Sequence, residues 1–210
     1  MRKLSGIIVF GIAFGLVEAA VVVYLRSIGY PEGFGFASGR LPADILRVEI
    51  IREGATILML VTAAHLAGKT PLGRFGAFLT VFGVWDLSYY VWLKVFLGWP
   101  ETLLDGDILF LIPGVWAGPV LAPVMVSLAF VGCGSWIFWR EETDRPVRTR
   151  PMDWIVELAG ALVIIASFLI SDIIPGPDPG DEVSLLFPWW FFLAGFSGGL
   201  GYFLWRVFQR

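Results

Sequence analysis

The chain has 210 residues, of which 57% are hydrophobic and 16% are charged, and its formal net charge is −3. Soluble domains are roughly 45–50% apolar and about 25% charged, so this composition excludes an ordinary soluble protein and favours a membrane protein. The charge pattern contains no basic stripe, and we expect no nucleic-acid partner. Cys133 and His65 are the only cysteine and histidine, so neither a Cys-ligated cluster nor a bis-histidine haem can form within one chain, and no cofactor is predicted.

Six apolar segments follow one another along the chain, and each is long enough to cross a bilayer. A transmembrane helix needs about 20 predominantly apolar residues. The sequence therefore predicts an all-α fold, a six-helix membrane bundle that forms a single domain over residues 1–210. The first segment follows Arg2 and Lys3 as in a signal peptide, but it carries Glu18 and ends without a small-residue cleavage site, so we expect it to be retained. The predicted spans are 5–25, 47–67, 75–97, 116–139, 154–174 and 187–208.

An irregular segment, residues 107–119, precedes the fourth span. Asp107 is a candidate N-cap for one short turn of helix, and Pro113 would end that turn because proline lacks a backbone donor. Broken backbone at membrane depth is tolerated only where protein or a cavity covers it. The segment is therefore either a short helix or re-entrant hairpin on the outer side, or an interfacial loop that leads into a proline-kinked helix.

The distribution of lysine and arginine predicts the orientation. Because cytoplasmic loops are enriched in these residues, we expect both termini in the cytoplasm, in a multi-pass protein of the cell (cytoplasmic or inner) membrane. The predicted outer loops 98–107 and 175–186 carry acids and no base. Membrane lipids are the expected partners, with other membrane subunits as an alternative. Ten of the 15 basic residues fall on the inner side: Arg2, Lys3, Lys69, Arg74, Arg140, Arg145, Arg148, Arg150, Arg206 and Arg210.

Three carboxylates, Glu18, Glu53 and Asp86, lie inside apolar segments. An ionisable side chain in hydrocarbon costs roughly 2.5–3.5 kcal/mol on insertion scales, so each needs a partner, a proton, a bound ion or a water-filled cavity. At a rise of about 1.5 Å per residue, Asp86 lies near the membrane centre and the two glutamates lie in the outer half. We therefore expect a polar interior.

Other polar side chains are predicted at a similar depth. Glu49 precedes Glu53 by one turn on the same helix face, and two tyrosines follow Asp86 by one turn. If the first three helices touch, these groups form one cluster that opens outward. The candidate ligand- or ion-binding residues are Glu18, Glu49, Glu53, Asp86, Tyr89 and Tyr90, and the candidate charge partners are Arg52 and Lys94.

Three interpretations of this cluster compete. The leading one is an outward-facing carboxylate–tyrosine site for ion- or proton-linked ligand binding or transport. The first alternative is a non-catalytic subunit of a larger membrane complex, in which polar groups act as interhelical contacts. The second is a membrane enzyme that acts on a lipid or another apolar substrate. No Walker, GxSxG, HExxH or Rossmann motif occurs, so no catalytic residue or metal ligand is assigned.

Two weaker patterns concern helix packing. Small residues at four-residue spacing allow close approach of helix backbones in the first and sixth spans. Glu157, near the start of the fifth span, shares a face with Gly160, Ser167 and Ser171, which favours a packing seam over a polar pathway. The small-residue pairs are Gly11 with Gly15 and Gly195 with Gly199.

Overall fold

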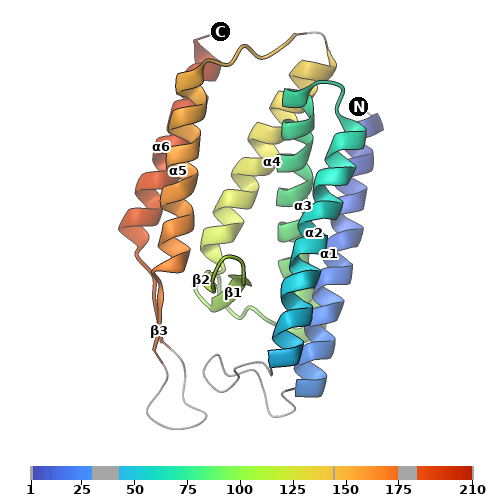
Figure 1. Cartoon of the computed structure of the whole chain (residues 1–210), viewed down its shortest axis with the longest axis vertical. Coiled ribbons are helices and arrows are strands. Elements are labelled where there is room, and N and C mark those ends of the chain that lie inside the picture. The colour runs from blue at the N-terminus through green and yellow to red at the C-terminus, as the bar shows by residue number, and fades with distance from the viewer. Residues whose placement is uncertain (1, 30–42, 144, 175–183, 210) are drawn as a thin grey trace.

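A computed structural model describes residues 2–29, 43–143, 145–174 and 184–209. The predicted all-helical architecture is confirmed, since six long helices run up and down along one axis (Figure 1). Arg210 and most of the predicted outer loop 175–186 lie outside the described residues. The helices are α1 (Arg2–Gly29), α2 (Ala43–Ala67), α3 (Pro71–Leu97), α4 (Leu121–Glu142), α5 (Pro151–Leu169) and α6 (Trp189–Phe208). The strands are β1 (Gly106–Phe110), β2 (Trp116–Pro119), β3 (Asp172–Ile174) and β4 (Ser184–Leu186).

Five of the described helices, α1, α2, α4, α5 and α6, are long and apolar enough to cross a membrane. The chain is therefore a multi-pass membrane protein by the length and composition of its helices. The remaining helix, α3, has 27 residues and carries Arg74, Asp86 and Lys94, and it is not among these five. It is also the most enclosed helix, because it packs against α1, α2 and α4.

Two predicted helix boundaries are wrong, and in both cases a strand replaces the missing helical residues. The fourth helix begins at Leu121 instead of residue 116, because Trp116–Pro119 forms β2. The fifth helix ends at Leu169 instead of residue 174, because Asp172–Ile174 pairs with Ser184–Leu186 in an antiparallel ribbon. Both ribbons lie at the same end of the bundle (Figure 1), and we call this the hairpin end.

The segment 107–119 is a β-hairpin, so the prediction of a short helix capped by Asp107 is wrong. Asp107 pairs with Gly118 and Ile108 with Ala117 across the β1–β2 ladder, which is interrupted by a bulge before Phe110. The turn contains Pro113 and Gly114, a dipeptide that terminates strands. Strand pairing provides hydrogen-bond partners for backbone N–H and C=O groups that a broken helix would leave unpaired. Non-helical backbone inside a membrane protein requires such partners.

The loop from α3 to the hairpin is organised by Asp105. Its carboxylate accepts hydrogen bonds from the backbone N–H of Glu101 at 2.7 Å and from the Oγ1 hydroxyl of Thr102 at 2.6 Å. Partial burial acts to raise the pKa of Asp105, but the hydrogen bonds from Thr102 and Glu101 outweigh burial and lower that pKa below its ordinary value. The carboxylate therefore stabilises this turn in its charged form.

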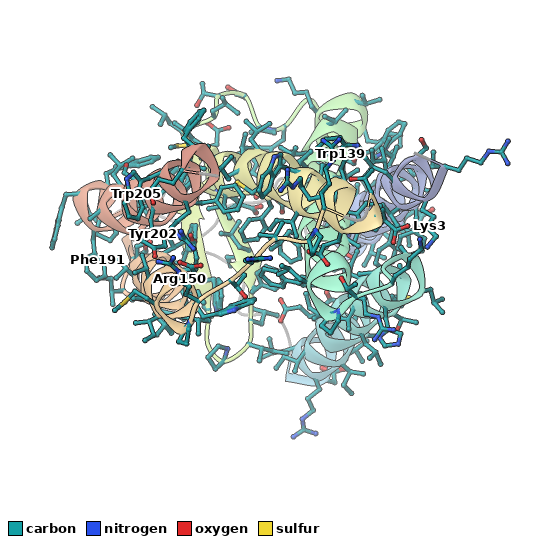
Figure 2. All side chains as sticks on the ribbon, turned by 90° about the horizontal axis from the view of Figure 1, so that it is seen from above. Lys3, Trp139, Arg150, Phe191, Tyr202 and Trp205 are labelled. Carbon is teal, nitrogen blue, oxygen red and sulfur yellow. The ribbon has the colours of Figure 1, made fainter. Side chains whose placement is uncertain are left out.

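Both described ends of the chain, together with the α2–α3 and α4–α5 connections, lie at the opposite end, which we call the termini end (Figure 1). The prediction that the termini share one side is consistent with this arrangement, whereas the side of the membrane to which they point stays a prediction. Viewed from the termini end, α4 lies between the α1–α3 group and the α5–α6 pair (Figure 2). Lys3 and Arg150, both basic residues of the predicted inner side, lie at this end in different helical groups.

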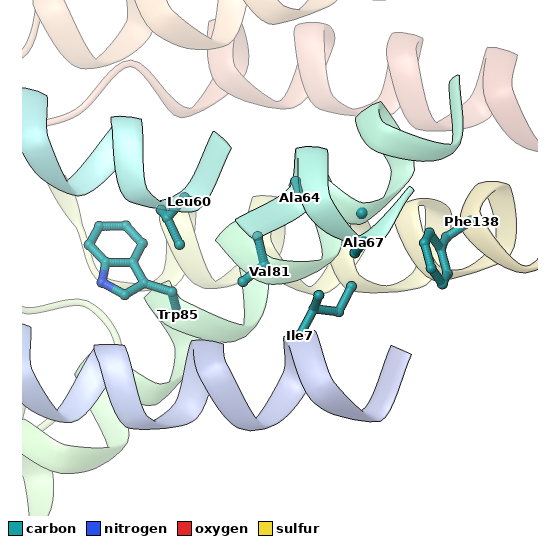
Figure 3. Close-up of a cluster of buried hydrophobic side chains, with 8 residues drawn as sticks. Ile7, Leu60, Ala64, Ala67, Val81, Trp85 and Phe138 are labelled. Atoms are coloured by element: carbon teal, nitrogen blue, oxygen red, sulfur yellow. The ribbon is translucent and has the colours of Figure 1, made fainter. Parts of the chain in front are cut away.

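The main hydrophobic core lies among α1, α2, α3 and α4 (Figure 3). Gly15 allows α1 to approach α3 closely, because a Cβ there would lie 2.7 Å from the carbonyl oxygen of Trp85. A second, smaller core joins α4, α5 and α6 through Ala122, Phe168 and Phe192. Contacts between the two helical groups are sparse and gather around β2. The main core consists of Ile7, Leu60, Ala64, Ala67, Ala77, Val81, Trp85 and Phe138.

Candidate functional site

The predicted polar cluster divides into separate groups, and the first is an ion-pair network between α1 and α2. The Arg52 guanidinium donates from Nη1 to Glu18 and from Nε to Glu49 Oε2, the latter at 2.8 Å. Thr56 Oγ1 donates to the second oxygen of Glu18 at 3.3 Å. One arginine thus neutralises two carboxylates at a helix contact, which is a structural use of these residues.

The second group centres on Asp86, which is only 8% exposed. Ser127 Oγ on α4 donates to Asp86 Oδ2 at 2.7 Å, so the carboxylate joins α3 to α4. One helical turn further, the Tyr90 hydroxyl donates to Asp107 Oδ2 of β1 at 3.1 Å. The Tyr89 ring packs against the Tyr90 ring at a centroid distance of 5.0 Å. Tyrosine and aspartate therefore connect the middle of α3 to the β-hairpin.

Glu53 lies one turn beyond Glu49 on α2 and is also 8% exposed. Its Oε1 accepts the backbone N–H of Leu111, in the β1–β2 connection, at 2.8 Å. Its Oε2 is buried and has no hydrogen-bond partner among the described residues. A buried acceptor without a partner costs about 1–3 kcal/mol, so this oxygen is a candidate contact for a ligand.

Lys94 lies apart from the carboxylates that it was proposed to neutralise. Its Nζ donates to the backbone carbonyls of Gly98 at 2.9 Å and Pro100 at 2.7 Å, beyond the end of α3. These bonds satisfy carbonyls at the helix C-terminus, where a cation is favourable. Of the two predicted charge partners, Arg52 contacts predicted site residues and Lys94 contacts the loop.

A cavity of about 830 Å³ separates the α2–α3–α4 side of the bundle from the α5–α6 pair. This volume falls within the range of roughly 300–1,000 Å³ that is typical of small-molecule sites. Glu53 and Asp86 both line the cavity, whereas Glu18, Glu49, Tyr89 and Tyr90 are not among the lining residues. The walls are mainly aliphatic and aromatic, with Phe78, Phe82, Phe110, Trp116, Phe130 and Phe168 among them.

The cavity reaches the side of the bundle between α2 and α5. Four large apolar side chains line the cavity and are also exposed on the surface, so they mark a lateral opening. At the termini end the opening is narrowed by Phe75 and Trp154, whose ring centroids are 5.4 Å apart. Gly54 of α2 also lines the opening, and a Cβ there would meet no atom within 4 Å. The four side chains are Phe75, Ile112, Trp154 and Leu158.

Several polar groups of the cavity were not identified from the sequence as site residues. Ser127 is the partner of Asp86, and the indole Nε1 of Trp116 is buried without a hydrogen-bond partner among the described residues. Glu157, interpreted above as part of a packing seam, also lines the cavity. At the termini end, Arg206 of α6 binds Asp153 of α5 through two hydrogen bonds of 2.8 and 3.0 Å.

A serine or tryptophan inside an apolar segment carries little signal by itself, because either residue is common in membrane helices. Ser127 and Trp116 become recognisable only when the helix that faces them is known. Within the described part of the chain, no three or more His, Cys, Asp or Glu side chains gather as a metal-binding group. The arrangement is instead that of an apolar cavity with a few hydrogen-bonding groups in its wall, which suits an organic ligand.

Comparisons with protein-family models, with curated proteins and with solved structures found no match to this chain.

Proposed function

We propose that the protein is a six-span membrane protein, with α3 as the sixth span, that binds a lipophilic molecule from the bilayer in its lateral cavity. The ligand carries a hydrogen-bond donor, such as a hydroxyl or amine, which reaches Glu53 and Asp86. The observation that carries this proposal is Glu53, which lines an apolar cavity of about 830 Å³ and whose buried Oε2 is an acceptor without a partner among the described residues.

The energetics favour a donor group on the ligand. A hydrogen bond to a charged group contributes about 1.5–3 kcal/mol, and it also removes the penalty of leaving Glu53 Oε2 unpaired. Trp116 Nε1 can donate to the same head group, because it is also unpaired among the described residues and lines the same cavity. The apolar remainder of the ligand would contact the aromatic walls, at roughly 25 cal/mol per Å² of buried apolar surface.

The lateral opening supports entry from the lipid phase. Its exposed residues Phe75, Ile112, Trp154 and Leu158 would face hydrocarbon if α2 and α5 span the bilayer. Glu53 Oε2 and Trp116 Nε1 are unpaired polar atoms, among the described residues, of two residues in the cavity wall, which favours a ligand with polar groups over the apolar face of a partner helix.

Binding by the purified protein in lipid nanodiscs tests the proposal. The probes are 1-dodecanol and dodecyl methyl ether, which share the apolar chain and differ in the hydroxyl donor. We expect saturable binding of dodecanol, and about tenfold weaker binding after Glu53→Gln, because the side-chain amide presents a donor where Oε2 accepts. Asp44→Asn is the matched control, since Asp44 is exposed on the same helix and outside the cavity. Equal binding of alcohol and ether by the parent protein would refute the proposal.

A proton-linked form of this function is tested at Asp86. Asp86→Asn preserves size and the acceptor for Ser127 but removes titration. If Asp86 exchanges a proton during binding, dodecanol affinity should depend on pH in the parent protein and not in the variant. Superimposable pH profiles for the two proteins would reject the proton link, and Asp86 would then be an interhelical contact.

A further inference from the structure

Glu157 is a second carboxylate in the cavity wall, on the α5–α6 side. One of its oxygens faces α6, because a Cβ on Gly199 would lie 3.4 Å from Glu157 Oε2. The absence of a side chain at Gly199 leaves room beside this carboxylate. Glu157 makes no hydrogen bond or ion pair with the residues that the structure describes, although it lies within a helix apolar enough to span the membrane.

The cation near Glu157 is already bound. Arg206 lines the same cavity, but its Nε and Nη2 both donate to Asp153. The Tyr202 hydroxyl donates to the same carboxylate at 2.7 Å. Figure 2 shows Tyr202 beside Arg150, which precedes α5, at the termini end. Arg206 and Tyr202 thus bind Asp153, and neither makes a hydrogen bond to Glu157.

Glu157 and Asp86 lie at different depths of the cavity. The helices α3 and α5 both begin at the termini end (Figure 1), and Asp86 is 15 residues from Pro71 whereas Glu157 is six residues from Pro151. The difference of nine residues corresponds to about 13 Å along the bundle axis. Glu53 lies toward the hairpin end, at the level of Asp86, because its carboxylate accepts a hydrogen bond from the Leu111 N–H in the β1–β2 connection. The cavity therefore has acceptors at two levels with an apolar wall between them.

From this geometry we infer that the ligand carries hydrogen-bond donors at both ends of an apolar chain. One end reaches Glu53 and Asp86, the other reaches Glu157, and an unbranched or slender apolar body of about 13 Å contacts the aromatic wall. This inference rests on the proposed function, because it specifies the ligand of the same cavity. A ligand with one polar end would leave Glu157 with water as its partner.

The test compares 1,12-dodecanediol with 1-dodecanol on the full-length protein in nanodiscs. Glu157→Met removes the acceptor at nearly constant length, and Glu157→Gln keeps a weaker one. We expect Glu157→Met to weaken diol binding about tenfold relative to the parent, with a smaller loss for Glu157→Gln, and to change dodecanol affinity by less than about twofold. Each ligand is compared with itself across proteins, so differences in membrane partitioning cancel.

Glu53→Gln is the matched variant at the other level, and it should weaken both ligands. Unchanged dodecanol binding by Glu157→Met also demonstrates that this variant is folded. Equal loss of diol and dodecanol in Glu157→Met, or no loss of either, would overturn the two-ended ligand while leaving the proposed function intact. If neither ligand bound the parent protein saturably, the proposed function itself would fail, and the inference with it.

Discussion

Removal of Arg52 should destabilise the protein strongly, because one guanidinium pairs with one buried and one largely buried carboxylate. The side chains of Glu18 and Glu49 are 12% and 9% exposed, and that of Arg52 is 27% exposed. Breaking a buried ion pair by removing one partner costs about 3–5 kcal/mol, since the other charge remains unpaired in a poorly solvated site. Partial exposure of Arg52 admits some water, so we expect a loss near the lower limit, about 3 kcal/mol, for Arg52→Met.

A set of three variants separates the charge effect from packing. Arg52→Met leaves two unpaired carboxylates, Glu18→Gln with Glu49→Gln leaves an unpaired cation, and the triple variant carries no charge at this contact. Neutral replacement of a complete buried network is often close to neutral, so the triple variant should recover to within about 1 kcal/mol of the parent. Equilibrium unfolding in mixed micelles, followed by circular dichroism, measures these differences.

A change of less than about 0.5 kcal/mol in the free energy of unfolding of Arg52→Met would contradict a buried ion pair, because exposed ion pairs contribute only that much. A triple variant as unstable as Arg52→Met would contradict the charge effect. That result would mean that the aliphatic part of the arginine, rather than its charge, holds α1 against α2.

Three further expectations follow from single positions. Gly76→Ala should lower the free energy of unfolding by at least about 2 kcal/mol, because a Cβ would lie 2.8 Å from the carbonyl oxygen of Gly134 on α4. Gly132→Ala is the control and should change it little, because a Cβ at Gly132 meets open space. Equal unfolding midpoints for the two variants would contradict the close contact at Gly76. Because the pKa of Asp105 is lowered in the folded state, its contribution to stability is complete above about pH 4 and is lost as the pH falls through the folded-state pKa. The parent should therefore lose more thermal stability than Asp105→Asn between about pH 5 and 3. Parallel losses in the two proteins would contradict a stabilising role of the charged Asp105 carboxylate. Arg145→Cys, in a cysteine-free background, should resist an impermeant thiol reagent added from outside intact cells, and strong labelling would reverse the predicted orientation.

Helix number and type were predictable, but the β-hairpin was not. Long apolar segments specify helices because a bilayer-spanning chain must satisfy its own backbone groups. Short apolar runs do not distinguish helix from strand, so the segment 107–119 was left open between a short helix, a re-entrant hairpin and an interfacial loop. The Pro113–Gly114 dipeptide between two short apolar stretches was the available signal for a hairpin. This dipeptide indicates a hairpin only when the stretches on its two sides are known to pair with each other.

The structure brings the predicted cluster only partly together, because helical spacing gives the depth and relative face of a residue but not the neighbouring helix that this face meets. Glu18, Glu53 and Asp86 were placed at related depths, but Glu53 and Asp86 line the cavity whereas Glu18 pairs with Arg52. The Arg52–Glu49 contact follows from three-residue spacing on one helix. Which neighbouring helix supplies each further partner depends on tertiary packing, and this is why Ser127 was missed, whereas the packing seam predicted at Gly160 is found against Gly195 of α6.

The sparse connection between the α1–α4 group and the α5–α6 pair has a consequence for assembly. The first group contains a complete core and is synthesised first, so it can become a cooperative unit before α5 and α6 dock. Docking then buries the small second core around Phe168 and completes the cavity wall. If the proposed ligand is held by side chains from both units, it binds the docked state alone and stabilises it by mass action. Folding of the protein and occupancy of the cavity would then be one linked equilibrium.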